Sequence, residues 1–329
     1  MNRYCLLSLA FLLVTVTNAD ERWLEFPGGD GPGAGKHIVL VSGDHEYRSE
    51  EAFPQLGKIL SKHHGFKCTV LFAIDPKTGE INPESVTNIP GLEALETADL
   101  VVFGLRFRNL EDDQMERIVD YAEAGRPMMA LRTSTHPFNI PADRKYAKYS
   151  WNHGGQDFQG GFGKQILGET WVSHHGHHGR ESTRGIVADA LHPIATGIKD
   201  GEIWGPTDVY GIRLPISGDA HTVIKGQVLV GMSADDKPVE GKKNDPMMPI
   251  GWTRTYKDGR TFTTTMGSAD DLPSEGVRRM LVNAAYWCVG LEDSIKPDSN
   301  VDLVGEYVPT KFGFGKYVKG KRPSDYDLK

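Results

Sequence analysis

Two kinds of hydrophobic pattern alternate between residues 36 and 131. Short runs in which nearly every residue is apolar are typical of strands that are buried on both faces. Between these runs, apolar residues recur at the spacing of an amphipathic helix. The predicted strands span 37–42, 67–72, 100–104 and 127–131, and the predicted helices span 52–63, 92–95 and 111–124. Continuous apolar strands separated by helices indicate parallel β-α-β units, so this region predicts a doubly wound α/β fold.

The pattern changes after residue 132. Residues 133–165 are rich in Gly, His, Asn and Asp and predict a long loop region, and its length favours a functional role. Further strands are predicted near 170–174, 184–188 and 223–233, with a hairpin over 250–256 and 260–266 and a closing helix over 274–289.

The two ends of the chain stand apart from this pattern. Residues 1–19 carry one positive charge, Arg3, followed by an apolar run and small residues, which is the order of a secretory signal peptide. The apolar run is short for a membrane span, so we expect no span in the mature chain and predict export to the periplasm or the medium. Residues 20–35 form a Gly-rich lead-in, residues 36–292 form the domain, and residues 293–329 form a tail.

The charge and the cysteine content of the chain exclude some classes of function but do not select a single one. The 329 residues carry a formal net charge of −7, which argues against nucleic acid as the main partner because phosphate binding needs clustered positive charge. Removal of the leader leaves Cys68 and Cys288, and the sequence is compatible with two buried thiols or with one disulfide. The sequence also leaves open whether the chain forms a homo-oligomer.

Polar residues follow the first predicted strand of the domain. In an open parallel sheet, ligands bind outside the carboxyl ends of the strands. Asp44 and Glu46 can act as a base or a metal ligand, and His45 can transfer protons near neutral pH. Asp44, Tyr47 and Arg48 are also candidate substrate contacts. The alternative is a polar loop whose acids complement the dipole of the following helix.

Arginines follow two other predicted strands. Arg106 leaves the third strand and Arg132 leaves the fourth, and we expect both to meet Arg48 above one sheet edge. An arginine fork suits a carboxylate, a phosphate or vicinal hydroxyl groups. The alternative is three separate structural ion pairs.

The residues after Arg132 add candidate chemistry. Thr133 and Ser134 are candidate substrate contacts, and His136 is a candidate for proton transfer. Ser134 as a nucleophile is the minor alternative, because no G-x-S-x-G motif is present. Asp271 follows the last predicted strand and can line the same crevice.

A histidine cluster occupies residues 174–178, where four of five residues are histidine. Such a cluster suggests a divalent metal such as zinc, with His174, His175 and Asp208 as candidate ligands. Successive strand residues face opposite sides, so about two of the histidines can share one site unless the loop folds back. A solvated loop is the alternative.

Several segments together resemble the ThuA-like (trehalose-utilisation) family. The resemblance covers residues 36–292, and the order of its motifs along one chain is more specific than any single motif. The segments are GDHEYRSEE at 43–51, LRTSTH at 131–136, ILG at 166–168, WVSHH at 171–175, HPI at 192–194, DVY at 208–210, IGWTR at 250–254, GRTF at 259–262 and MGSADD at 266–271.

The resemblance implies both a fold and a field of function. It implies a flavodoxin-like three-layer α/β/α sandwich with a mainly parallel sheet, similar to class I glutamine amidotransferases. It also implies a link to sugar metabolism, centred on trehalose-type disaccharides and their 3-keto derivatives. The amidotransferase cysteine is absent from residues 132–136, so amidotransferase chemistry is not expected. Ser268 and Val209 stand where the family often has a histidine and an acid.

The sequence thus predicts an exported carbohydrate-processing protein that uses general acid–base isomerisation or hydrolysis. His45, Glu46 and His136 would transfer protons, while the three arginines would orient the substrate or stabilise an oxyanion. A noncatalytic carbohydrate-binding domain on the same fold is the rival prediction, and a zinc-dependent hydrolase is the third.

Overall fold

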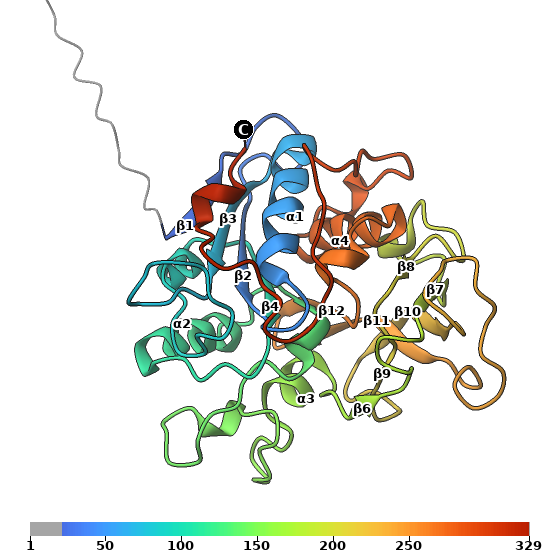
Figure 1. The fold of residues 1–329 in the computed structure, drawn as a ribbon, viewed down its shortest axis with the longest axis horizontal. Coiled ribbons are helices and arrows are strands. Elements are labelled where there is room, and N and C mark those ends of the chain that lie inside the picture. The colour runs from blue at the N-terminus through green and yellow to red at the C-terminus, as the bar shows by residue number, and fades with distance from the viewer. Residues whose placement is uncertain (1–21, 329) are drawn as a thin grey trace, which may run out of the picture.

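The computed structural model describes residues 22–328. Its centre is a ten-stranded sheet, with the strand order β1-β3-β2-β4-β5-β12-β11-β10-β7-β8 (Figure 1). The strands of this sheet are β1 (Trp23–Phe26), β2 (His37–Gly43), β3 (Lys67–Phe72), β4 (Leu100–Leu105), β5 (Met128–Leu131), β7 (Thr183–Val187), β8 (Trp204–Gly205), β10 (His221–Val228), β11 (Met248–Tyr256) and β12 (Gly259–Thr264).

Five neighbouring strands of the sheet run parallel. These are β3, β2, β4, β5 and β12, and every residue of β2, β4 and β5 is buried. Their burial explains the continuous apolar runs, because helices cover both faces of this half of the sheet. The α/β fold class predicted from those runs is confirmed.

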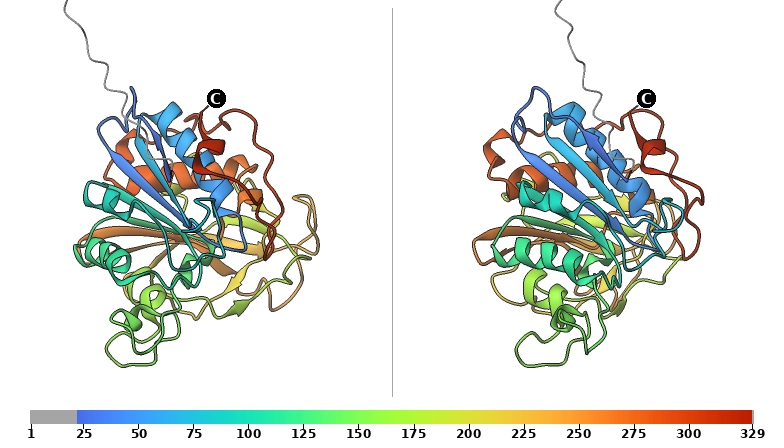
Figure 2. Two further views of the ribbon diagram at one scale, coloured as in Figure 1. Left: turned by 60° about the vertical axis from the view of Figure 1, so that its left-hand side comes forward. Right: turned by 90° about the vertical axis from the view of Figure 1, so that its left-hand side faces the viewer.

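The helices lie on two sides of the sheet (Figure 2). Residues of α1 (Ser49–His64) and α4 (Glu275–Cys288) belong to one hydrophobic core, and residues of α2 (Asp112–Glu123) and α3 (Gly161–Leu167) belong to the other. The result is three layers, with α1 and α4 on one face and α2 and α3 on the opposite face. Short 3-10 helices complete the fold, namely η1 (Leu92–Glu96), η2 (Arg132–Thr135), η3 (Ala147–Tyr149), η4 (Pro193–Ala195), η5 (Ala269–Asp271), η6 (Glu292–Ser294) and η7 (Pro323–Tyr326).

The second half of the chain extends the sheet with antiparallel strands. The predicted hairpin is confirmed as β11 and β12, which pair from Gly251 with Thr264 to Tyr256 with Gly259. β10, β7 and β8 continue outward in antiparallel pairs. β6 (Ser173–His174) and β9 (Tyr210–Gly211) form a separate two-stranded sheet, so the predicted strand over 170–174 shortens to two residues.

The predicted loop region 133–165 contains secondary structure that the sequence pattern did not reveal. Helix α3 is only seven residues long and begins at Gly161, directly after Gly160, and both glycines have positive φ. Such a short helix with glycines at its start has weak intrinsic propensity, and packing against the sheet stabilises it.

The described part of the tail predicted over 293–329, residues 293–328, passes along α1, and its helix η7 lies near β1 (Figure 1). Phe312 of this tail is buried, and the backbone NH of Ile81 donates to the carbonyl of Lys321. Cys68 and Cys288 are separate buried thiols, which excludes the disulfide. No helix within residues 22–328 is long and apolar enough to span a membrane. The predicted signal peptide lies outside the described residues.

Candidate functional site

Asp44 holds together two loops at the carboxyl ends of β2 and β5. Its Oδ1 accepts the backbone NH groups of Glu46 at 2.7 Å and Tyr47 at 3.2 Å, and its Oδ2 accepts the hydroxyl of Thr133 at 2.6 Å. Asp44 and Thr133 are both buried. Asp44 and Thr133, which were both predicted to contact the substrate, are therefore hydrogen-bonded to each other, and they position the residues beside them.

Arg132 occupies the sharp turn directly after β5. Its φ of 48° lies in the left-handed region, which is strained for a long side chain and is common at functional sites. The guanidinium lies over the rings of Tyr47 and Tyr210, with Cζ 4.3 Å and 3.8 Å from their centroids. One amino group, Nη2, donates to the Tyr47 hydroxyl at 3.0 Å and to Asp208 Oδ1 at 2.9 Å. Stacking and pairing together fix the charge in a buried position.

Asp208 is the centre of the site. Its buried carboxylate pairs with Arg132 and also contacts two imidazoles, with Oδ2 2.7 Å from His174 Nδ1 and Oδ1 3.1 Å from His178 Nδ1. Burial alone would raise the pKa of this carboxyl group. The hydrogen bonds with His174 and His178 and the Arg132 charge outweigh that effect and hold the pKa below its usual range.

In both imidazoles, Nε2 is not used in the contact with Asp208 and can take part in a reaction. The side chains of His174 and His178 are 38% and 36% exposed, and Nε2 of His178 lies 3.6 Å from Oε1 of Glu46. Among residues 22–328, none bonds Nε2 of His174. Ligand atoms of His174, His178 and Asp208 all lie within 4.8 Å of one another, which is close enough for them to hold one metal ion.

His175 does not join this group. Its Nε2 lies 2.8 Å from the carbonyl oxygen of Lys243, on a different side of the loop. The structure therefore replaces the predicted ligand set of His174, His175 and Asp208 by His174, His178 and Asp208. The reason is that the loop after β6 folds back, so that residues four positions apart share one side.

Glu46 faces this centre from the loop after β2. Its Oε2 lies 3.3 Å from Nε of Arg106, and burial together with the nearby Asp44 charge raises the pKa of its carboxyl group. A carboxyl group with a raised pKa retains a proton more readily near neutral pH, which suits a general acid.

His45 lies between two arginines. Nη1 of Arg106 is 2.7 Å from its Nε2, and Nη2 of Arg108 is 2.9 Å from its Nδ1. Burial and the two arginine charges lower the pKa of His45 to about 4, so the ring is neutral near pH 7. A neutral imidazole has a single lone pair. Because both ring nitrogens face guanidinium groups, His45 is poorly placed to take a proton from a substrate.

Each of the three arginines in the predicted fork has contacts within the chain. Arg132 binds Asp208, and Arg106 binds Glu46 and His45. Arg48 is fully buried and donates to the carbonyls of His45 at 3.1 Å and Gly313 at 3.2 Å. These contacts orient the guanidinium groups, and binding of one shared ligand by the three arginines stays a prediction.

His136 and Ser134 lie behind the centre. The ring of His136 is buried among Phe107, Trp171 and Tyr210, and this burial holds the pKa of His136 well below its usual range. The hydroxyl of Ser134 donates to the carbonyl of Phe103. Ser134 therefore joins β4 to the turn after β5, and His136 lies within an aromatic cluster.

The tail closes one side of the site. Phe312 packs against Tyr47 and His178, with ring centroids 5.4 Å and 5.2 Å apart. Phe314 lies over His45 and Arg106 and is 57% exposed. The backbone NH of Gly313 donates to the carbonyl of Glu46 at 2.7 Å. The Gly-Phe-Gly segment of the tail is thus part of the wall around the centre.

The sequence and the fold both have relatives. The family model described as "ThuA: Trehalose utilisation" matches residues 38–288. This chain belongs to the ThuA family. A putative ThuA-like protein from Bacteroides uniformis ATCC 8492 has a similar structure, with 15% identity, a TM-score of 0.50 and coverage of 83% of this chain and 98% of that chain. One from Parabacteroides merdae ATCC 43184 has 14% identity, a TM-score of 0.48 and coverage of 88% and 98%. No curated protein matches the chain.

The late turn of this ThuA domain supports Asp208 from behind. Asp271 is buried and accepts the backbone NH groups of Gly267 and Ser268 and the hydroxyl of Thr207, the neighbour of Asp208. Burial and the neighbouring Asp270 charge raise the pKa of Asp271 to about 7. Ser268 donates to the carbonyl of Tyr47. Both residues stabilise the loops behind the centre.

Four contributors to the site were missed from sequence. The residues that line or support the centre without having been predicted are His178, Tyr210, Arg108 and Phe312. Each of them reaches the centre through a contact that the sequence pattern does not show. For His178 a signal existed, because His174 and His178 stand four residues apart and metal-binding histidines often have that spacing.

Glu50, in the first turn of α1 of this ThuA domain, predicts a pH dependence of stability. Its carboxyl group is buried, and its one ion-pair partner within residues 22–328 is Arg48 at 3.5 Å. Burial raises the pKa of Glu50 from 4.5 to about 8, with the Arg48 charge opposing the shift. Between those values the folded chain keeps a proton that the unfolded chain has lost, so stability falls as pH rises through this range.

We therefore expect Glu50→Gln to flatten the pH dependence, by up to about 1 kcal/mol per pH unit between roughly pH 5 and pH 8. Urea denaturation of wild type and variant at several pH values measures the slope. Glu93→Gln, at an exposed position, is the matched control and is expected to leave the slope unchanged. Parallel slopes for Glu50→Gln and wild type would contradict the prediction.

Proposed function

We propose that this chain binds a carbohydrate and acts on it by general acid–base chemistry at the centre formed by His174, His178, Asp208 and Glu46. The observation that carries the proposal is a pair of partly exposed imidazoles that contact one buried carboxylate at the carboxyl ends of the parallel strands. A histidine oriented through Nδ1 by a carboxylate is a common form of general base.

The geometry assigns a role to each group. With its Nδ1–H donated to Asp208, His174 presents a lone pair on Nε2, and Asp208 stabilises the imidazolium that forms when this nitrogen takes a proton. Glu46, with its raised pKa, is the acid that returns a proton. Arg106 lies beside Glu46, where it can stabilise a developing oxyanion.

A 3-keto-glycoside suits this arrangement. His174 would take the proton from the carbon beside the keto group, and the electron pair of that C–H bond would form an enediolate. Glu46 would protonate the enediolate oxygen that was the ketone. His174 would then return the first proton to the carbon that was the ketone, while the neighbouring hydroxyl group would lose its proton to Glu46. The keto group has then moved to the neighbouring carbon, and the sugar has been isomerised with no net change in atoms. Hydrolysis at the same centre is the neighbouring alternative, and the family's link to trehalose utilisation supports a sugar substrate.

A metal-assisted reaction is the second candidate. The observation in its favour is that ligand atoms of His174, His178 and Asp208 lie within 4.8 Å of one another. A divalent ion bound by these three residues would supply Lewis-acid polarisation of a sugar oxygen. The chain's own residues would still bind and orient the substrate. We include export in the proposal, on the strength of the leader at residues 1–19.

The test is product formation from trehalose and 3-keto-trehalose, followed by proton NMR, with and without added Zn²⁺, Mn²⁺ or Ni²⁺. We expect the wild-type chain, residues 20–329, to convert the keto sugar, and the His174→Ala/His178→Ala variant to lack this activity while staying folded. Saturable binding without any product would favour the noncatalytic binding domain instead. Loss of turnover on chelation, restored by one added ion, would select the metal-assisted reaction.

A further inference from the structure

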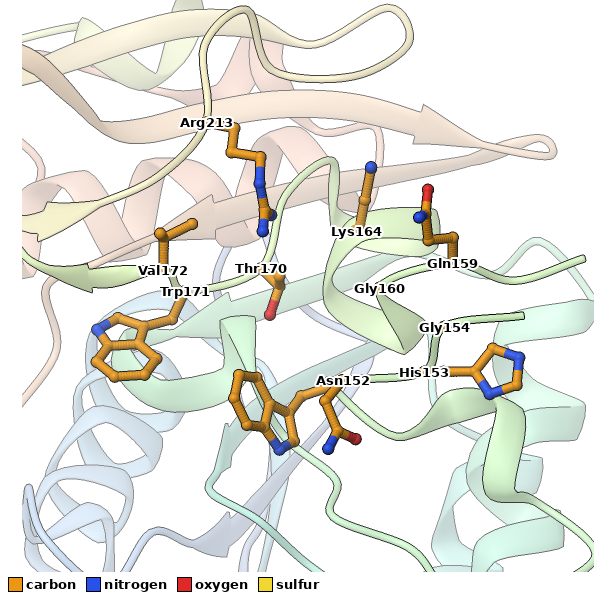
Figure 3. A pocket seen from close by; sticks show the side chains of 11 residues that line it. Asn152, His153, Gly154, Gln159, Gly160, Lys164, Thr170, Trp171, Val172 and Arg213 are labelled. Carbon is orange, nitrogen blue, oxygen red and sulfur yellow. The ribbon is translucent and has the colours of Figure 1, made fainter. Parts of the chain in front are cut away.

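A pocket of about 390 Å³ lies next to the centre, between the loop that precedes α3 and the segment that follows it. This volume is within the range of small-molecule sites. Trp151 is one of the lining residues. Figure 3 shows Asn152 along one side of the pocket, and the side chains of Lys164 and Arg213 along the opposite side. None of the residues that line it belongs to the four that form the centre.

Trp171 joins the pocket to the centre. Trp171 is one of the lining residues, and its ring lies 5.7 Å from the ring of His174, measured between centroids. The rings of Trp151 and Trp171 are 6.4 Å apart. A molecule that extends past Trp171 would therefore place one part against Trp151 and another part at the centre.

One polar group of the pocket lacks a partner within the described chain. The buried Oγ1 of Thr170 has no hydrogen-bond partner among residues 22–328, although an unpaired buried hydroxyl is costly. In Figure 3 the Thr170 side chain lies between the side chains of Arg213 and Asn152. A bound polar ligand would satisfy this hydroxyl.

The charges in the pocket are partly balanced. Arg213 pairs with the buried Glu169 at 3.2 Å, so its charge has a partner while its remaining NH groups can still donate. Lys164 adds one further donor at the rim. A sugar ring has apolar faces and many hydroxyl groups. Such a ring suits a pocket that combines tryptophan side chains with several hydrogen-bond donors and the amide of Asn152.

We propose that this pocket is the subsite that holds the second ring of a disaccharide substrate. The first ring would occupy the centre, and the second would pack on Trp151 and hydrogen-bond to Thr170 and Arg213. This inference rests on the proposed function and adds the place where the second ring binds and the residues that select it. Trp151 and Thr170 are then specificity residues that do not take part in proton transfer.

Binding of trehalose and of glucose to the purified chain, measured by calorimetry, tests the subsite. We expect the wild type to bind trehalose at least about tenfold more tightly than glucose, since trehalose fills both regions. Trp151→Ala is expected to weaken trehalose binding about fivefold or more and glucose binding less than about twofold. Thr170→Val is expected to act in the same direction. Trp151→Phe retains an aromatic face and should recover most of the trehalose affinity.

The outcomes separate the subsite from the catalytic centre. Equal affinities for the two sugars, or equal weakening of both by Trp151→Ala in a chain with unchanged melting temperature, would overturn the subsite. Conversion of 3-keto-trehalose by the same wild-type preparation would then leave the proposed function intact. Saturable binding of neither sugar would overturn the subsite, and absence of product as well would overturn the proposed function. Lys199→Ala, at an exposed position remote from the pocket residues in sequence, is the control.

Discussion

Replacement of Asp208 by alanine is expected to lower the free energy of unfolding by about 3–5 kcal/mol. The side chain of Asp208 is fully buried and neutralises Arg132, whose guanidinium is also buried. Removal of one partner from such a pair leaves an uncompensated charge in the interior, which is far more costly than loss of a surface pair. Urea denaturation near pH 7 measures the difference.

Asp219→Ala is the matched control for this variant. Asp219 pairs with Arg254 at 3.6 Å, but its side chain is 55% exposed, and exposed pairs contribute about 0–1 kcal/mol. Asp208→Asn keeps the shape of the side chain and is expected to fold better than Asp208→Ala. A loss below about 1 kcal/mol for Asp208→Ala would show that Arg132 finds another partner and that the pair is not the anchor of the site.

His174→Ala is expected to reduce kcat for the converted sugar by about 10²–10⁴, the range for loss of a general acid–base group. The structure supports this role because Asp208 orients Nδ1 and no residue from 22 to 328 bonds Nε2. His175→Ala is the matched control and is expected to change kcat less than about threefold, since its ring bonds the Lys243 carbonyl instead. Steady-state kinetics of the two variants make the comparison.

The same pair of variants also tests the metal-assisted alternative. If Zn²⁺ or another divalent ion copurifies with the wild type, we expect elemental mass spectrometry to find it retained in His175→Ala and lost in His174→Ala. Equal losses of activity in the two variants would contradict the assignment of His174. Such a result would show that either substitution disturbs the loop as a whole, and that the imidazole of His174 has no specific role.

Much of the fold could be predicted from local pattern. The apolar runs of β2, β3, β4 and β5 are continuous because both faces of the parallel sheet are covered, and this burial leaves a direct trace in the sequence. The hairpin of β11 and β12 was equally visible from its turn residues. Helix α3 was not visible, because a helix of seven residues owes its stability to packing.

The sequence indicated which loops come together, but it did not indicate the contacts between their side chains. The carboxyl ends of parallel strands bring the loops after β2 and β5 together, and Asp44 contacts Thr133 while Tyr47 contacts Arg132. The predicted fork of three arginines did not anticipate that each guanidinium contacts a carboxylate, a carbonyl or a ring of the chain itself.

The sequence by itself determined the α/β class, the parallel half of the sheet and membership of the ThuA family. Each of these follows from periodicity or from the order of motifs, which are local properties of the chain. Only the tertiary structure decided that His178 and not His175 joins His174, that Arg132 neutralises Asp208, and that the tail forms a wall of the site. These choices depend on distances between side chains far apart in sequence, and packing of the whole domain sets those distances.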